Sequence, residues 1–296
     1  MAVSVGVLGA GAVGGMLGVL LAKAGHDVTV LVSDRTSTAI NVNGLVLRSA
    51  RYGDAHVRVP ARPWLTTPVD VLFVAVKAPD LLAALTRVPG SLLHGASVVP
   101  LLNGIGHVPL LRAVFPEAVV VPMTVAVEAT RLEPGVVEHL SPFADYAICE
   151  GSQEPAKDPA MLLRGAGLDV DSSAPDEATL LWRKLCLLAP FALLTTAARD
   201  ALGPAREARP DLLDALVSET AAAAAVHEVQ VDPAGIRQRL HGLPGGMRSS
   251  MLKDALVGAA LELDAIAGPI LRAAPDGAPV TRRVVAEITR AAEPAL

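Results

Sequence analysis

Short apolar runs alternate with stretches of helical periodicity over roughly the first 170 residues of the chain. Residues 3–8, 69–76 and 96–102 are almost continuously apolar, which is typical of strands buried on both faces of a parallel sheet. Helical spacing follows the first two of these runs, at residues 13–24 and 79–87. Strands that alternate with helices predict an α/β domain with a doubly wound parallel sheet. The same patterns predict further strands at residues 25–32, 119–128 and 135–140, and a short helix at 155–165.

Residues 36–68 interrupt this alternation, because the stretch is polar and rich in turn-forming residues. Within it, residues 44–48 and 55–59 alternate between apolar and polar positions, as short exposed strands do. We expect these two strands to decorate one edge of the sheet.

The period changes near residue 175, and almost everything that follows has helical spacing. Helices are predicted at residues 178–197, 210–229, 250–273 and 280–292, separated by Pro/Gly loops such as 242–246. The polar segment 169–175 ends in proline and places a domain boundary near residues 170–176. It predicts two domains: an α/β domain over residues 1–173 and an all-α helical domain over 174–296. Ligands of open α/β sheets bind outside the carboxyl ends of the strands, so we expect the active site in the cleft between the two domains.

A glycine motif joins the first predicted strand to the first predicted helix. Gly9, Gly11 and Gly14 form the spacing GxGxxG directly after the strand, within a strand–helix–strand unit. In such a unit the first glycine makes the tight turn, the second lets a pyrophosphate approach the backbone, and the third lets helix and strand pack closely. The helix N-terminus then favours the negative phosphates. The motif predicts a Rossmann-type dinucleotide site made by Gly9, Ala10, Gly11, Ala12, Val13 and Gly14.

Composition and charge narrow the possible partners. The 296 residues are 52% hydrophobic and 19% charged, which suits a packed two-domain protein. The net charge is −5 and Lys/Arg residues do not cluster, so nucleic acid is not an expected partner. The chain opens on the strand pattern and its apolar runs are interrupted, so we expect neither a signal peptide nor a membrane span. Cys149 and Cys186 stand far apart, which indicates a reducing cytoplasm and argues against a disulfide or a metal site.

Four polar residues stand out from their surroundings. Lys77 and Asn103 follow predicted strands at the end where such sheets hold ligands, although each alone suits a loop start or a turn. Lys184 lies within a strongly apolar helix, where an ammonium group needs a partner or a task unless its side chain extends to the helix surface. Of the acidic residues in the helix pattern 250–273, Glu262 or Asp264 is the natural candidate to pair with it.

Ser249 and Ser250 precede the apolar part of that helix pattern, residues 255–270, and helix N-capping is their ordinary role. On one straight helix Ser250 and Glu262 would stand ~18 Å apart, at a rise of ~1.5 Å per residue. A small substrate cannot touch both. Either the helix is broken near Gly258, or Glu262 acts through Lys184.

The order of these motifs resembles ketopantoate reductase, also called 2-dehydropantoate 2-reductase. The resemblance covers essentially the whole chain and rests on six motifs that occur in a fixed order. They are Gly9-Ala-Gly-Ala-Val-Gly14, Val76-Lys-Ala78, Leu102-Asn-Gly-Ile-Gly106, Trp182-Arg-Lys-Leu185, Ser249-Ser-Met-Leu-Lys-Asp254 and Glu262-Leu-Asp-Ala-Ile-Ala-Gly268.

The resemblance implies reduction of a 2-oxo acid to a 2-hydroxy acid with NADPH, in a two-domain fold like that of 6-phosphogluconate dehydrogenase. By position, Lys184 matches the family's general acid and Glu262 the acid that holds it. Asn103 and Lys77 match residues that line the nicotinamide and substrate site, and Ser250 matches a substrate-binding hydroxyl. Stabilising the negative charge that grows on the carbonyl oxygen is a sensible task for a fixed cationic donor.

The chain departs from the family's pattern at its substrate-binding asparagines. The positions four and eight residues after Lys184 are Leu188 and Ala192, and Met247 and Ala267 replace two further asparagines. A pocket discriminates through the hydrogen bonds it makes, so their loss changes which substrate is accepted. Leu188, Ala192 and Met247 favour a 2-oxo acid with an apolar chain, or another ketone, over ketopantoate.

The end of the second strand bears on the cofactor. NAD sites place an acidic residue there for the ribose 2′-hydroxyl, whereas NADP sites place Arg or Ser for the 2′-phosphate. Ser33 aligns with the family's phosphate-binding arginine, and Arg35 follows closely. We expect NADP, held by Ser33 and Arg35. Asp34 leaves NAD as the alternative.

Other readings stay open. The replacement of the family's asparagines suits a non-catalytic sensor that binds the dinucleotide, although such a sensor needs neither Lys184 nor Glu262. A related dehydrogenase acting on a 3-hydroxy acid or an imine would keep the hydride chemistry. The alanine-rich segment 220–229 serves either as a packing face within one subunit or as the seam of a homodimer.

Overall fold

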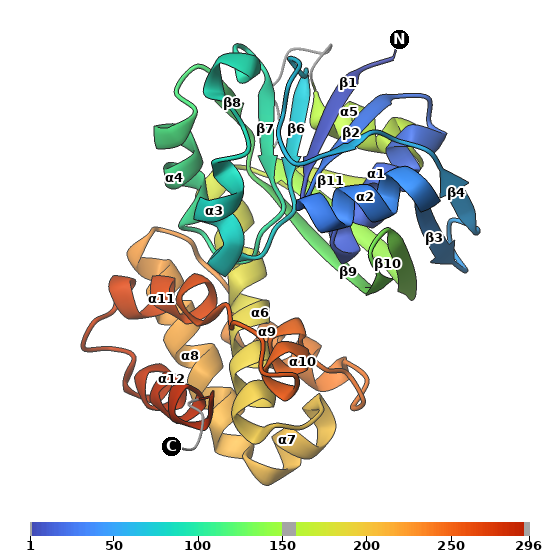
Figure 1. Ribbon diagram of the computed structural model, residues 1–296. Helices are drawn as coiled ribbons and strands as arrows, with labels where there is room; N and C mark the ends of the chain where they lie inside the picture. The colour runs from blue at the N-terminus through green and yellow to red at the C-terminus, as the bar shows by residue number, and fades with distance from the viewer. Residues whose placement is uncertain (1, 150–157, 293–296) are drawn as a thin grey trace. The chain divides into compact units, whose positions relative to one another are not determined.

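The computed structural model describes residues 2–149 and 158–292 of the chain. The chain divides into two compact units. The first comprises Met1–Leu102 and His107–Leu180, and the second comprises Asn103–Gly106 and Leu181–Leu296 (Figure 1). The short segment Asn103–Gly106 therefore packs with the helical residues. A single domain boundary in the sequence cannot describe this division.

The first unit is built on the predicted parallel sheet. Its strand order is β5-β2-β1-β6-β7-β8, and every neighbouring pair is parallel. The order reverses between β1 and β6, which makes this the switch point where open α/β sheets bind ligands. The strands are β1 (Ser4–Leu8), β2 (Asp27–Leu31), β5 (Ala61–Arg62), β6 (Val71–Val74), β7 (Ser97–Pro100) and β8 (Val119–Val120).

The helices of this unit include two that were not predicted, α2 (Asp34–Asn43) and α4 (His107–Val114). Helix α2 buries only Ser37 and Ile40, so the segment carries too little apolar periodicity to indicate a helix. The predicted helix at 155–165 is α5 (Pro159–Gly165), and residues 155–157 lie outside the described part of the chain. The remaining helical segments are α1 (Ala12–Lys23), η1 (Ala78–Asp80), α3 (Leu81–Leu85) and η2 (Gly90–Leu93).

A second sheet corrects the prediction that residues 44–48 and 55–59 decorate the edge of the first. Its order is β11-β10-β3-β4, with β9 paired to β10, so β3 (Leu45–Ser49) and β4 (Ala55–Val57) belong to it. β3 runs parallel to β10, a partner about 90 residues away that local alternation cannot reveal. The other strands are β9 (Met123–Glu133), β10 (Val136–Cys149) and β11 (Asp169–Ala174).

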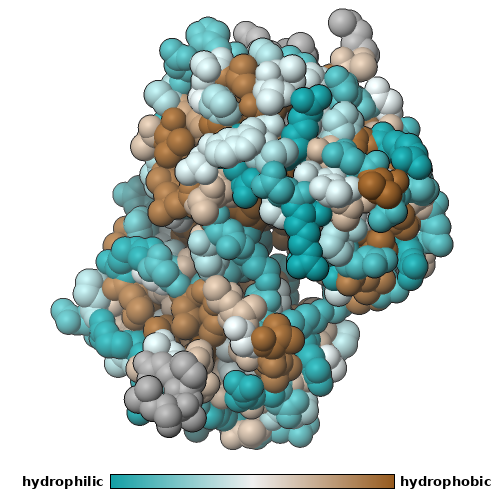
Figure 2. Space-filling model, in the orientation of Figure 1, coloured by the Kyte–Doolittle hydropathy of each residue, from teal (hydrophilic) through white to brown (hydrophobic). Residues whose placement is uncertain are grey.

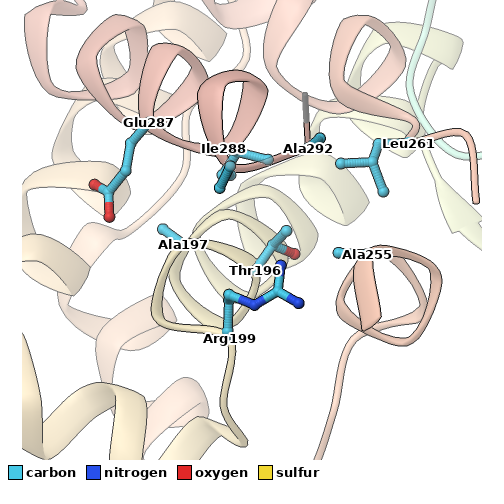
Figure 3. A pocket seen from close by; sticks show the side chains of 9 residues that line it. Thr196, Ala197, Arg199, Ala255, Leu261, Glu287, Ile288 and Ala292 are labelled. Atoms are coloured by element: carbon cyan, nitrogen blue, oxygen red, sulfur yellow. The ribbon is translucent and has the colours of Figure 1, made fainter. Parts of the chain in front are cut away.

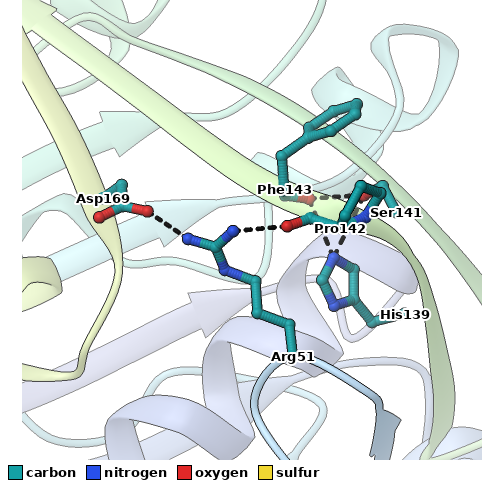
Figure 4. A network of polar contacts seen from close by, with 6 residues as sticks. All are labelled: Arg51, His139, Ser141, Pro142, Phe143 and Asp169. Atoms are coloured by element: carbon teal, nitrogen blue, oxygen red, sulfur yellow. Dashed lines mark hydrogen bonds and ion pairs between the residues drawn. The ribbon is translucent and has the colours of Figure 1, made fainter.

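A polar network holds the irregular middle of β10, where the pairing register with β9 shifts between His139 and Ala144. The His139 ring bonds Ser49 Oγ at 2.9 Å and the Phe143 carbonyl oxygen at 3.0 Å. Arg51 donates to the Pro142 carbonyl and to Asp169 on β11 (Figure 4). These side chains satisfy backbone groups that the bulge removes from the ladder.

The second unit is helical, as predicted. Two of its helices, α7 (Leu202–Ala208) and α9 (Pro233–Gly242), were not predicted, because they are short and carry a weak apolar pattern. The predicted helix 250–273 consists of two helices, α10 (Ser250–Leu256) and α11 (Leu263–Ala273), with Gly258 between them at a φ of +68°. The break near Gly258 is the first of the two alternatives raised above. The other helices are α6 (Glu177–Ala198), α8 (Pro210–Val226) and α12 (Pro279–Ala292).

The alanine-rich face of α8 packs within this unit, since Ala221, Ala223 and Ala224 are buried there. In the described residues, α6 alone is long and apolar enough to cross a membrane, but 61% of its most apolar window is buried inside the protein. On the face drawn in Figure 2, hydrophobic residues form small groups among polar ones.

Candidate functional site

The glycine turn after β1 is shaped by close backbone contacts. Gly9 has a φ of +96°, and a Cβ built on Gly14 would lie 1.9 Å from the Gly9 carbonyl oxygen and 2.9 Å from the Ala75 Cβ. A Cβ on Gly11 would meet no described atom within 4 Å. Gly9 and Gly14 are therefore demanded by the fold, whereas Gly11 leaves open space above the turn. Ala10 is buried beneath it, and Ala12 and Val13 begin α1.

This arrangement fits the pyrophosphate of a dinucleotide. Gly11 is the N-cap residue of α1 and has no side chain with which to cap the helix. The first turn of α1 carries no acidic residue, so the positive end of its dipole faces the open space without a competing anion. The residues after β6 border the same turn: a Cβ on Gly9 would lie 2.7 Å from the Val76 side chain. Lys77 follows directly and is exposed, so its backbone lies next to the turn at the switch point.

The end of β2 carries the residues expected to choose the cofactor. Ser33 is the N-cap of α2, where its hydroxyl oxygen accepts from the Thr36 N–H at 3.4 Å. Asp34 is the first residue of that helix, where a carboxylate is favoured by the helix dipole. Asp34 thus has a structural reason for its place besides contact with a ribose. Arg35 is exposed on the same turn.

Three residues near this strand end escaped the sequence analysis. Arg87 donates to the carbonyl oxygen of Val32 at 3.2 Å and to that of Pro63 at 3.0 Å. Arg62 lies alongside, since the Val32 N–H donates to its carbonyl oxygen at 3.0 Å. Trp64 is 52% exposed. Arg35, Arg62 and Arg87 form what we call the β2 arginine group. Nothing in the sequence connects them, because β5 and the turn after α3 reach β2 only through the fold.

Lys184 is held by a polar partner. Its Nζ donates to Asn103 Oδ1 at 2.9 Å. Burial lowers the pKa of Lys184 to about 8, and the negative charge of Glu262 opposes this by raising the pKa. The amine is thus charged near neutral pH but gives up its proton more readily than an exposed lysine.

Asn103 connects Lys184 with Glu262. While its Oδ1 accepts from the lysine, its Nδ2 donates to Glu262 Oε2 at 3.1 Å. The position of Asn103 is set by the next residue, Gly104, which has a φ of +87°. A Cβ built on Gly104 would lie 2.2 Å from the Ala265 carbonyl oxygen. The loop after Asn103 therefore packs tightly on the start of α11.

Glu262 is 4% exposed and lies at the N-terminal end of α11. The other acidic candidate, Asp264, has an 87% exposed side chain and pairs with Arg272 at 2.8 Å. Glu262 is thus the carboxylate that shares an environment with the lysine. We call Lys184, Asn103 and Glu262 the lysine set. It brings together three segments that are remote in the sequence.

The remaining predicted residues are more dispersed. Leu188 is half-buried one turn after Lys184, Ala192 is fully buried, and Met247 is half-buried in the loop before α10. Ser250 is exposed at the first position of α10.

Its neighbour Ser249 makes the cap. The Ser249 oxygen accepts from the Leu252 N–H at 3.1 Å and lies 2.8 Å from Thr195 Oγ1. Thr195 is about 16 Å further along α6 than Lys184, at ~1.5 Å per residue. Ser249 and the lysine set therefore lie at different levels of α6.

Two family models match the chain. The one described as "Ketopantoate reductase PanE/ApbA" matches residues 5–149, and its C-terminal counterpart matches residues 178–293. A 2-dehydropantoate 2-reductase of Mycobacterium tuberculosis is 32% identical over 287 residues, which is 93% of this chain and 92% of the relative. An uncharacterized oxidoreductase of Bacillus subtilis is 28% identical over 293 residues, with coverage of 95% and 96%.

Solved structures agree with these matches. A ketopantoate reductase from Ralstonia eutropha JMP134 superposes with a TM-score of 0.85 at 27% identity, covering 97% of this chain and 98% of that one. A D-mandelate dehydrogenase solved with NADH and anilino(oxo)acetate superposes with a TM-score of 0.86 at 22% identity, with the same coverage. The second similarity shows a shared fold.

Proposed function

The chain belongs to the ketopantoate reductase family, and we propose that it reduces a 2-oxo acid to a 2-hydroxy acid with NADPH. Oxidoreductase activity on small keto acids is characteristic of the family. The proposal extends to the cofactor preference and to the class of substrate.

The lysine set carries the proposal. Lys184 Nζ is the proton donor to the oxygen of the 2-oxo group, whose negative charge grows during reduction. Its bond to Asn103 Oδ1 orients the amine, and the charge of Glu262 keeps it protonated. A lysine with a pKa of about 8 suits this task, because proton transfer is most effective when the pKa lies near the working pH.

The same set argues against a non-catalytic sensor. Taking a lysine and a glutamate out of water is seldom better for stability than an apolar replacement. Glu262 is nevertheless almost fully buried near a desolvated Lys184. A task in proton transfer explains why the two are kept.

The glycine turn would hold the pyrophosphate of the cofactor, with Gly11 facing it and Lys77 beside it. The bound dinucleotide supplies the hydride. We propose NADP because Ser33 offers a hydroxyl and Arg35 an exposed guanidinium for the 2′-phosphate, and the other residues of the β2 arginine group add positive charge near the same strand end. Asp34, which would favour NAD, has its place at the start of α2 explained by the helix dipole.

The substrate is proposed to be a 2-oxo acid with an apolar chain. Leu188, Ala192 and Met247 stand where the family places asparagines, so a hydroxylated chain would lose hydrogen bonds at those positions. A pocket that lacks such partners discriminates against polar substrates.

A substrate panel tests the proposal. Ketopantoate, branched aliphatic 2-oxo acids, an aromatic 2-oxo acid and a 3-oxo acid are compared by the loss of NADPH or NADH absorbance, with Lys184→Ala as the control. We expect the highest kcat/KM for a branched apolar 2-oxo acid with NADPH. A preference for ketopantoate would refute the apolar pocket, and undiminished turnover by Lys184→Ala would refute the assigned proton donor.

A further inference from the structure

The helical unit contains a small cavity at the C-terminal end of α6, which we call the Arg199 cavity. Its volume is about 50 Å³ (Figure 3). Its walls come from the end of α6, from α10, from the segment before α11 and from α12. The residues that define it are Thr196, Arg199, Ala255, Leu261, Glu287 and Ile288.

One wall carries a hydroxyl group that lacks a partner. Thr196 is 4% exposed, and its Oγ1 makes no hydrogen bond within the described part of the chain. Two other buried helix threonines bond back to the preceding turn: Thr195 Oγ1 donates to the Phe191 carbonyl at 2.8 Å, and Thr220 Oγ1 to that of Leu216 at 2.7 Å. A buried polar group without a partner is costly, so the Thr196 hydroxyl points to an occupant of the cavity.

Arg199 occupies a strained position at the mouth. Its φ is +54°, in the left-handed region that glycine normally fills after a helix. The backbone turn there is regular, since the Arg199 and Asp200 N–H groups donate to the Thr196 and Thr195 carbonyls, each at 3.2 Å. Glycine would make the same turn at lower cost. Figure 3 shows the Arg199 guanidinium on the same side of the cavity as Thr196.

The charge of the cavity is that of Arg199. The acidic residue in the wall, Glu287, is held by Arg209 through two hydrogen bonds of 2.7 and 3.0 Å, so its negative charge is balanced. The rest of the lining consists of alanine, leucine and isoleucine side chains. A guanidinium and a hydroxyl set in an apolar wall match a carboxylate with a short alkyl group.

The size sets an upper limit on that ligand. One water needs roughly 10–15 Å³ of such space, so the cavity holds about three to five groups of that size. Acetate and propionate fall in this range. Thr196 is about 18 Å from Lys184 along α6, at ~1.5 Å per residue, so this site is separate from the lysine set.

We propose that the Arg199 cavity binds a short-chain aliphatic monocarboxylate. The carboxylate accepts hydrogen bonds from the Arg199 guanidinium and the Thr196 hydroxyl, while the alkyl group packs against Leu261 and Ile288. Leu261 directly precedes Glu262, so the ligand contacts the segment that leads into the lysine set.

Titration with propionate, followed by ¹H–¹⁵N NMR of the full chain, tests the proposal. We expect saturable shifts at residues that line the cavity. Thr196→Val, which removes the hydroxyl but keeps the shape, and Arg199→Gln should each weaken binding about tenfold or more, as loss of one hydrogen bond to a charged group does. Arg239→Gln, which removes an exposed arginine from the last turn of α9, is the matched control and should bind like the parent.

Arg199→Gly separates a ligand role from a structural one. Glycine suits the left-handed backbone, so this variant should unfold at the same or a higher temperature while losing propionate binding. Ala255→Leu, which fills the cavity, should also abolish binding. The proposal fails if propionate produces no saturable shifts, if binding survives in Arg199→Gly and Thr196→Val, or if Arg239→Gln weakens it equally. None of these measurements needs turnover, so they do not depend on the proposed reductase activity.

Discussion

The two units prepare their candidate sites by different means. In the first unit the glycine turn is a backbone device: Gly9 adopts a positive φ, and Gly14 has no room for a Cβ. In the helical unit the lysine set is made by side chains drawn from α6, from the loop at Asn103 and from the start of α11.

The contrast has a practical consequence. A backbone device cannot be altered without altering the fold around it, because the same glycines shape the turn and pack the helix on the strand. Side chains that meet from separate segments can be removed singly while the fold survives. The lysine set should therefore separate chemistry from stability, whereas the glycine turn should combine them.

Removal of the lysine is the sharpest test of this contrast. Lys184→Ala should lower kcat by about 10²–10⁴-fold, which is the usual contribution of a positioned general acid. Circular dichroism should show an unchanged helical content. Arg183→Ala removes the exposed positive charge of the preceding residue on α6 and should leave kcat within about twofold. Equal losses in the two variants would mean that the helix, rather than the amine, is responsible.

Two glycine substitutions test whether the glycine turn combines stability with cofactor binding. Gly14→Ala forces a Cβ to within 1.9 Å of the Gly9 carbonyl oxygen, so the free energy of unfolding should fall by about 3 kcal/mol or more. Gly11→Ala meets no described atom within 4 Å and should change stability by less than about 1 kcal/mol. Its added methyl group should nevertheless weaken dinucleotide binding. Urea unfolding and NADPH titration measure the two effects, and a destabilised Gly11→Ala would contradict the contrast.

The same contrast explains what could be predicted from the sequence. The glycine turn is local, since strand, turn and helix follow one another within residues 4–23, and it was predicted from the spacing of its glycines together with the strand and helix patterns that flank them. Charge in an apolar segment requires a partner, so Glu262 or Asp264 was expected to pair with Lys184, and the family resemblance favoured Glu262. The link through Asn103 was not predicted, since it depends on how the loop at Gly104 packs against α11.

Contacts that join segments distant in the sequence could not be predicted. The pairing of β3 with β10 and the approach of Arg87 to Val32 leave no local periodicity. Helix α2 was not predicted for another reason. Its segment is polar and rich in turn-forming residues, and a Ser33 cap with two buried residues is too weak a pattern to indicate a helix.

Replacement of the carboxylate probes the electrostatics within the lysine set. The charge of Glu262 raises the pKa of Lys184, which burial lowers to about 8. Reduction requires the protonated amine, so kcat should fall as the pH rises through this pKa. In Glu262→Gln the supporting charge is gone, the pKa of Lys184 drops further, and the fall in kcat should begin at lower pH. Asp264→Asn, whose exposed carboxylate pairs with Arg272, should leave the pH profile unchanged. A profile that moves in Asp264→Asn but not in Glu262→Gln would reverse the assignment.

Substitutions in the serine pair at the start of α10 should have the smallest effects, and they separate a helix-capping role from a substrate-binding role. Ser249 caps the helix and lies 2.8 Å from Thr195 Oγ1 in a buried environment, so Ser249→Ala should lower the free energy of unfolding by about 1–2 kcal/mol. Ser250 is exposed, and Ser250→Ala should stay within about 0.5 kcal/mol of the parent. If Ser250 binds substrate, as its place in the family implies, the same variant should raise KM several-fold at unchanged kcat. A stability loss in Ser250→Ala would make it a structural residue, and a KM unchanged for every substrate would remove it from the site.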